Sequence, residues 1–125
     1  MNNLELKEKI LEKAKELCDI ARKEYVEAWA KENGYYDYVG KAYKRTYGDI
    51  YYFITKIKDI NELRAIQVTA EEDLGIAIKG DIFFITPESL HEDQQDEEKM
   101  YEEITVQAFK EKLQEVFSQI MEKVK

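Results

Sequence analysis

The chain has 125 residues, of which 44% are hydrophobic and 37% charged, and its 19 basic and 27 acidic side chains give a formal net charge of −8. This length corresponds to a single domain, and the composition is too apolar and too aromatic for a disordered chain. No apolar run approaches the roughly 20 residues that span a bilayer, and the residues after Met1 lack the basic-then-apolar profile of a secretory signal. We therefore expect a cytoplasmic protein that does not bind membranes, and its single cysteine, Cys18, fits a reducing compartment.

A long amphipathic helix is predicted over residues 4–31. Asn2 or Asn3 is a suitable N-cap, and Asn33-Gly34 supplies the left-handed residue that commonly ends a helix. Apolar residues recur at steps of three and four along this segment, at Leu6, Ile10, Ala14, Leu17, Ala21, Tyr25 and Trp29. We expect this stripe to be buried against the rest of the protein.

An antiparallel meander of three or four strands is predicted over residues 39–85. Aromatic and β-branched residues dominate here, and the apolar periodicity changes to two. The clearest strands are expected at residues 50–60, 63–69 and 74–85. Their connections are short, whereas parallel strands need crossovers of a dozen or more residues, so neighbouring strands should be antiparallel.

A polar, acidic connector and a second helix complete the chain. Pro87 is expected to end the sheet, residues 88–103 form the connector, and Thr105 caps a helix predicted over residues 105–124. The fold class is therefore α+β, with residues 1–125 in one domain. The expected core contains Leu17, Ala21, Phe53, Ile66, Ile78, Phe84, Phe109, Leu113 and Phe117.

Most of the net charge lies in the connector. Residues 88–103 hold eight acids and one base, Lys99, a local net charge of 1 − 8 = −7. Such a run attracts basic surfaces and repels nucleic acid. Two interpretations stay open, a solvated connector that keeps the protein soluble and a strip that binds a host protein with a basic surface. The candidate partner-binding residues, with Met100 and Tyr101 as apolar anchors, are Glu92, Asp93, Asp96, Glu97, Glu98, Met100, Tyr101, Glu102 and Glu103.

The sequence carries no clear catalytic, cofactor or metal signature. His91 lies among acids, at Glu92, Asp93 and Asp96, but the spacing of a calcium loop is missing, and one histidine without a nearby cysteine is not a zinc pattern. There is no Gly-rich phosphate loop and no nucleophile elbow. Cys18 lies on the apolar side of the first helix, where a small core residue is expected. We therefore expect a protein that is not an enzyme and holds no cofactor or metal.

Tyrosines cluster between Tyr35 and Tyr52, where seven of the nine occur. They suit a half-buried sheet face, contact with a protein partner, or stacking on bases while nearby cations hold phosphates. A nucleic-acid-binding module would use Lys41, Tyr43, Lys44, Arg45 and Tyr47. The net charge of −8 argues against direct nucleic-acid binding, which depends on clustered cations.

Three segments of the chain carry a resemblance to a known group of proteins. They are Val39-Gly40-Lys41-Ala42-Tyr43-Lys44, Ile50-Tyr51-Tyr52-Phe53-Ile54, and Glu103-Ile104-Thr105 with Phe109. Together they resemble small uncharacterised proteins of phages and prophages of low-GC Gram-positive bacteria. The resemblance implies an SH3-like curved sheet followed by a C-terminal helix, and a mobile-element origin, where many small acidic proteins inhibit host defence, as anti-CRISPR proteins do. An immunity protein against a toxin nuclease is the alternative from the same class.

Overall fold

The computed structural model describes residues 2–71 and 75–124. The elements in chain order are helix α1 (Asn3–Glu32), the 3-10 helix η1 (Tyr35–Tyr38), strands β1 (Ala42–Arg45), β2 (Ile50–Asp59), β3 (Glu62–Glu71) and β4 (Gly75–Phe83), helix α2 (Pro87–Gln95), strand β5 (Tyr101–Ile104) and helix α3 (Val106–Glu122). Leu74, where the third predicted strand begins, lies outside the described residues. The predicted α+β class, with a long helix at each end of the chain, is confirmed.

The strands form one five-stranded antiparallel sheet in the order β4-β3-β2-β1-β5. Four of them make the predicted meander, and β5 returns to pair with β1, with Ala42 opposite Ile104. The prediction of three or four strands missed β5 because it lies in the acidic run and Glu102 and Glu103 interrupt any apolar alternation. The SH3-like curvature implied by the resemblance stays a prediction.

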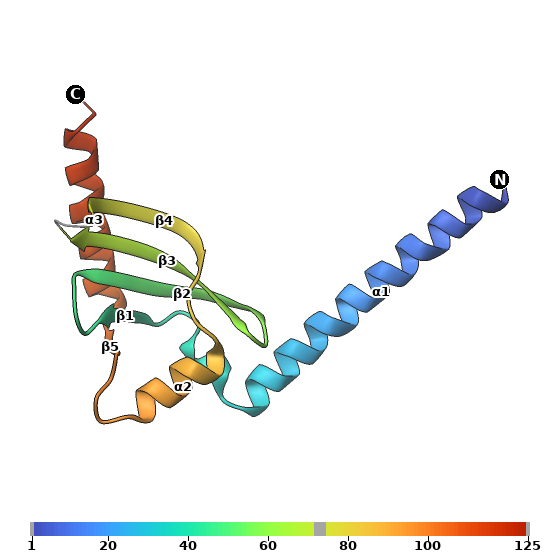
Figure 1. The fold of residues 1–125 in the computed structure, drawn as a ribbon, viewed down its shortest axis with the longest axis horizontal. Helices are drawn as coiled ribbons and strands as arrows, with labels where there is room; N and C mark the ends of the chain where they lie inside the picture. The colour runs from blue at the N-terminus through green and yellow to red at the C-terminus, as the bar shows by residue number, and fades with distance from the viewer. Residues whose placement is uncertain (1, 72–74, 125) are drawn as a thin grey trace.

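Each face of the sheet carries an apolar cluster, and α3 lies along one of the faces (Figure 1). On one face, Tyr38 of η1 and Leu90 of α2 pack in a cluster with Tyr43 and Ile54 of the strands. On the other face, Phe109 and Val116 of α3 pack on Ala42 and Val68. Alternate side chains of a strand point to opposite faces, so a central strand needs apolar residues at successive positions. This explains the unbroken apolar run at residues 50–54.

The helix ends follow local capping signals. The Asn2 side chain accepts a hydrogen bond from the Glu5 backbone N–H at 2.8 Å, and Thr105 does the same for Ala108 at 3.0 Å, so these predicted caps are confirmed. Pro87 has a different role from the one expected. It occupies the first turn of α2, after the Thr86 cap, where its missing N–H has no cost. The predicted connector therefore contains a helix.

Helix α1 projects away from the sheet instead of covering it (Figure 1). Val26 and Ala30, near its C-terminal end, are its buried residues. Leu17 is 60% exposed and Ala21 is exposed, so placing them in the core was wrong. Apolar periodicity identifies the face of a helix that avoids water, but it does not identify what covers that face.

The remaining core predictions depend on how close each residue lies to the sheet. Phe84 and Phe109 are buried as predicted, and Phe53, Ile66, Ile78 and Leu113 are half-buried against the second cluster. Phe117 was placed wrongly in the core, because it is 49% exposed on the outer side of α3.

The two phenylalanines of α3 give a matched test of this packing. Phe109 is 3% exposed and its ring centroid lies 5.8 Å from that of Phe53, so Phe109→Ala should lower the free energy of unfolding by about 3 to 5 kcal/mol. Phe117→Ala should cost about 1 kcal/mol, since half of that side chain is already in water. Urea denaturation measures both values, and equal losses would contradict the packing of α3 described above.

Candidate functional site

The acidic segment 88–103 is a folded part of the protein. Helix α2 and strand β5 flank a loop of residues 96–100, which is tied to the end of β1. The backbone N–H of Thr46 donates to the Met100 carbonyl at 2.8 Å, and its hydroxyl donates to the Lys99 carbonyl at 2.6 Å. Gln94 of α2 donates to the Tyr101 carbonyl at 2.7 Å. The segment is therefore ordered, and this order is compatible with both interpretations, the solvated connector and the partner-binding strip.

Asp93 holds this loop in place from the other side. Its two carboxylate oxygens accept hydrogen bonds from the backbone N–H groups of Met100, at 2.8 Å, and Tyr101, at 3.1 Å. Hydrogen bonds from N–H groups to a carboxylate are stronger than those between neutral groups. Asp93 is thus a structural residue rather than a free acid at the rim of an interface.

The other candidate acids are open to solvent. Glu92, Asp96, Glu97, Glu98 and Glu102 are exposed, and we call these five residues the acidic surface. Glu103 is also exposed, but its carboxylate lies 3.6 Å from the Lys41 ammonium, which offsets its charge. The acidic surface therefore keeps a high density of negative charge on an ordered scaffold.

The two candidate anchors have different environments. Met100 is 51% exposed in the loop. Tyr101 is half-buried, with its ring edge-on to Phe84 and Tyr52 at centroid distances of 4.8 and 5.8 Å. Burial raises the pKa of Tyr101 above its usual value. Tyr101 belongs to the core beneath the acidic surface, so of the two predicted anchors only Met100 is presented to a partner.

The residues of the nucleic-acid interpretation are not brought together as a stacking platform. Tyr43 is fully buried, and desolvation raises the pKa of its phenol strongly. The Lys44 ammonium binds the backbone carbonyls of Arg45 and Gly48 at 3.3 and 3.2 Å. Arg45 and Tyr47 are exposed, but with Tyr43 inside the protein the set has one exposed ring, that of Tyr47. Tyr43 was therefore misplaced as a base-stacking residue.

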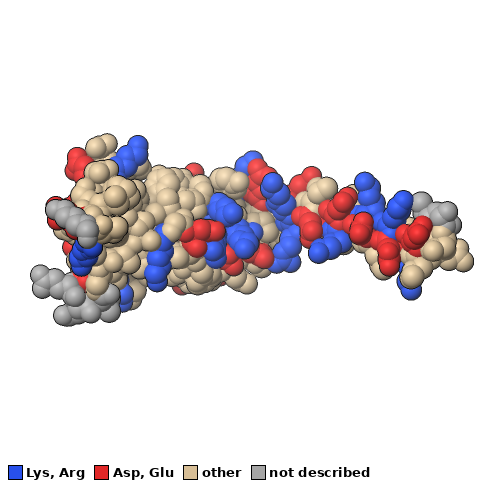
Figure 2. All heavy atoms as spheres, turned by 90° about the horizontal axis from the view of Figure 1, so that it is seen from above, with Lys and Arg blue, Asp and Glu red and all other residues tan. Residues whose placement is uncertain are grey.

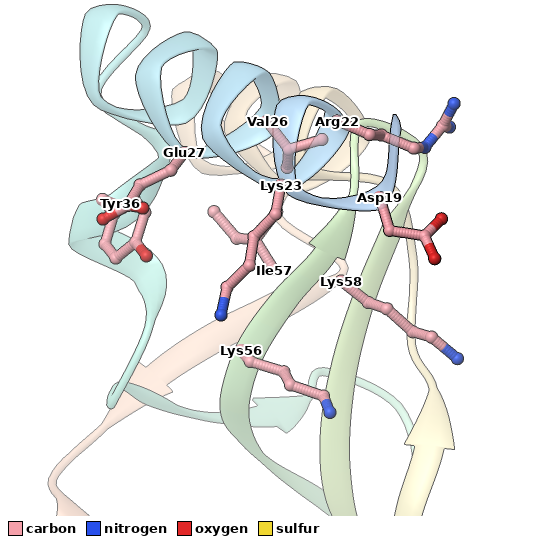
Figure 3. Close-up of a pocket in the computed structure, with 9 residues that line it drawn as sticks. All are labelled: Asp19, Arg22, Lys23, Val26, Glu27, Tyr36, Lys56, Ile57 and Lys58. Atoms are coloured by element: carbon pink, nitrogen blue, oxygen red, sulfur yellow. The ribbon is translucent and has the colours of Figure 1, made fainter. Parts of the chain in front are cut away.

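A basic cleft of about 420 Å³ lies between α1 and β2 (Figure 3). Arg22 and Lys23 of α1 and Lys56 and Lys58 of β2 line it, with two acids, Asp19 and Glu27. Figure 3 shows Lys23 directed from α1 toward β2. The sequence analysis missed this cleft because Lys23 and Lys56 are 56 − 23 = 33 residues apart and meet only through the packing of α1.

An ion pair stands at one edge of this cleft. Arg22 donates to the Asp59 carboxylate at 2.6 Å, and this hydrogen bond holds the pKa of Asp59 below its usual value. A similar pair on the neighbouring strands joins Arg64 and Asp81 at 3.0 Å and lowers the pKa of Asp81. Both acids are charged at neutral pH, so they fix the two arginines rather than acting as proton donors.

His91 and Cys18, which the sequence analysis considered for metal binding or chemistry, lie in different environments. His91 Nδ1 lies 2.8 Å from the Tyr38 hydroxyl, and its ring packs edge-on against Tyr35, which makes it part of the η1–α2 contact. Within the described residues, no group of three or more His, Cys, Asp and Glu side chains is placed to hold a metal ion. Cys18 is exposed on α1, so the expectation of a core cysteine was wrong. Across residues 2–71 and 75–124, no helix combines the length and apolar character that crossing a bilayer requires.

Comparison with known proteins found no match for the chain. No protein-family model matches it, and neither the curated proteins nor the solved structures give a significant match. The function must therefore be inferred from the chain's own residues and surfaces.

Tyr43 allows a direct test of its buried position. Its hydroxyl has no hydrogen-bond partner among the described residues, so Tyr43→Phe should leave the free energy of unfolding unchanged or raise it by about 1 kcal/mol. Tyr43→Ala should lower it by about 3 to 5 kcal/mol by opening a cavity. Thermal and urea denaturation compare the two variants. A large loss with Tyr43→Phe would mean that the hydroxyl is hydrogen-bonded.

Removing the Asp93 carboxylate should release the acidic loop. Asp93→Ala leaves two N–H groups without their acceptor, and we expect a loss of about 1 to 3 kcal/mol in unfolding free energy and faster amide exchange at Met100 and Tyr101. Glu92→Ala, at an exposed neighbouring position, is the control and should change stability by less than about 0.5 kcal/mol. Exchange rates that stay the same in both variants would show that Asp93 does not hold the loop.

Proposed function

We propose that the protein is a non-enzymatic inhibitor that binds a basic, nucleic-acid-binding surface of a host protein through the acidic surface. The observation that supports this most is the folding of the segment that carries these acids. Thr46, Asp93 and Gln94 hold its backbone by hydrogen bonds, so the chain that carries these carboxylates is ordered before a partner arrives. A preorganised surface loses less conformational freedom on binding than a flexible connector.

Electrostatics favours a basic partner of this kind. The segment 88–103 has a net charge of −7 within a chain of net charge −8, so the rest of the molecule adds almost nothing to the field. Concentrated carboxylates can occupy positions meant for phosphates, and they accelerate encounter with a cationic surface. Met100, exposed within the loop, supplies apolar contact that charge alone does not provide.

The alternatives differ in what they require of the surface. Direct nucleic-acid binding at the predicted strand face is less well supported, because Tyr43 is buried and Lys41 lies close to Glu103. An immunity protein against a toxin nuclease would use the same acidic surface, so the identity of the bound partner separates it from an inhibitor of host defence. The resemblance to phage and prophage proteins favours the defence inhibitor, in the manner of an anti-CRISPR protein acting in the bacterial cytoplasm.

The role of the acidic surface is tested by neutralising it. Pull-down from a host lysate with mass spectrometry first identifies the partner. Changing Glu92, Asp96, Glu97, Glu98 and Glu102 to their amides should then lower the association rate about tenfold or more at low salt and flatten its salt dependence, because steering depends on these charges. Stopped-flow kinetics or surface plasmon resonance over a salt series measures both effects.

The control for this experiment has the same net charge. Glu→Gln changes at five exposed positions elsewhere, Glu8, Glu12, Glu16, Glu111 and Glu122, also move the net charge to −8 + 5 = −3. The control should keep most of the association rate. Equal losses in the two variants would mean that only total charge matters, and unchanged rates in both would reject the acidic surface as the binding site.

A further inference from the structure

Helix α1 leaves a long apolar face in water. Its large side chains are each between 50% and 65% exposed, and they extend over about six helical turns, from Leu4 to Tyr25. We call this set the α1 face: Leu4, Leu6, Ile10, Leu11, Ala14, Leu17, Cys18, Ala21 and Tyr25. Monomeric proteins rarely expose apolar patches of this extent, and such patches commonly mark interaction sites.

The contact between α1 and the rest of the protein does not cover this face. That contact includes the Arg22–Asp59 ion pair and the packing of Trp29 on Tyr35, and its buried residues are Val26 and Ala30. At 3.6 residues per turn, the centre of the α1 face, near Ala14 and Ala21, lies about 150° around the helix axis from them. In Figure 1 the helix stands clear of the sheet along most of its length. A second helix can therefore lie along the α1 face without displacing the anchored end.

We propose that the occupant of the α1 face is α1 of a second copy of this chain, packed antiparallel about a two-fold axis near residues 15 and 16. A two-fold interface uses the same patch on both copies and closes the assembly at two chains. The α1 face suits such a pair because small residues, Ala14 and Ala21, run along its middle and let two helices approach closely. Larger side chains flank them on both sides.

The antiparallel alignment matches side chains by size. It sets Ala14 opposite Leu17 of the second copy and Ala21 opposite Ile10, so each close approach joins a small residue to a large one. Knobs of one helix then fill the holes of the other. A parallel pair would instead place like residues level with each other, alternating alanine layers with leucine layers and requiring two different helix separations.

Charge also matches in the antiparallel alignment and not in the parallel one. Lys7, which interrupts the α1 face, falls opposite Glu24 of the second copy, at both ends of the pair. In a parallel pair, Lys7 would face Lys7. Opposite charges that meet across a helix pair favour one orientation over the other.

The charge on the part of each copy outside α1 also favours this orientation. Residues 3–32 carry seven bases and eight acids, a net charge of −1, which leaves −7 for the rest of the chain. Figure 2 shows acidic and basic side chains interleaved along α1, so two such helices do not repel strongly. Antiparallel pairing puts the negatively charged parts of the two copies at opposite ends of the helix pair, about 37 Å apart along the helix axis. This separation is well beyond the Debye length of about 8 Å in physiological salt, so their repulsion is screened. Parallel pairing would place them side by side.

Oligomeric state in solution tests the α1 face. Sedimentation equilibrium or light scattering should give a mass near twice 14.8 kDa for the full chain at micromolar to 100 μM concentrations. Ile10→Glu with Leu17→Glu should weaken association at least about tenfold, because it places charge in the middle of the interface. Both residues are 60% exposed, so the fold of the monomer does not depend on them.

The matched control removes exposed apolar side chains from another helix end. Met121 and Val124 are 54% and 72% exposed at the end of α3, and changing both to Glu should leave the dimer intact. A wild-type monomer at 100 μM overturns the proposal. So does a dimer that survives the Ile10→Glu and Leu17→Glu changes, or one that is lost equally in the α3 control.

Orientation is measured separately with a spin label. In the Cys18→Ser background, a label at Asn3→Cys should report a distance of about 37 Å between copies in the antiparallel dimer, since the two N-terminal ends lie at opposite ends of the pair. A parallel dimer would give less than about 20 Å, and that result would overturn the proposed arrangement. Neither measurement depends on the acidic surface or its partner, so the outcome is independent of the proposed inhibitor function.

Discussion

The side chains of β2 alternate between two apolar clusters, one on each face of the sheet. Burying both sets determines where η1, α2 and α3 pack. Ile54 and Tyr52 pack toward η1 and α2, while Tyr51 and Phe53 pack toward α3. A five-stranded sheet that buries both faces needs a cover on each, and α2 and α3 supply those covers. The sheet contacts α1 through β2, close to the C-terminal end of the helix. That helix is held at one end and extends into solvent.

An element could be predicted from the sequence when the residues that define it are close together in the chain. The caps at Asn2 and Thr105 were predicted correctly because a capping side chain and the N–H it accepts from lie three residues apart. Strand β5 was missed because it joins the sheet by pairing with β1, which lies far away in the sequence: 104 − 42 = 62 positions at the Ala42–Ile104 pair and 101 − 45 = 56 at the Arg45–Tyr101 pair. A strand of four residues that forms by pairing with a distant strand has no periodic sequence pattern by which it could be recognised.

In the candidate site, too, local properties were predicted correctly and roles that depend on distant contacts were not. The exposure of Glu92, Asp96, Glu97 and Glu98 follows from composition alone, since carboxylates are rarely buried without partners. The structural roles of Asp93 and Tyr101 did not follow, because each depends on the return of the chain from α2 to β5. The same return of the chain orders the acidic segment, and it is the reason that Asp93, which holds the loop, is adjacent to Glu92, which is exposed.

The anchoring of α1 has a mechanical consequence. The helix is about 45 Å long but is fixed by contacts near one end, so it acts as a lever whose pivot lies at Val26 and Ala30. A tilt of about 10° at the pivot would move the N-terminus by roughly 6 to 8 Å, given the rise of 1.5 Å per residue. The Arg22–Asp59 ion pair lies one helical turn closer to the N-terminus than Val26 and connects α1 to the β2–β3 hairpin. This ion pair gives α1 a contact with the sheet further from Ala30, and a contact at that position opposes the tilt.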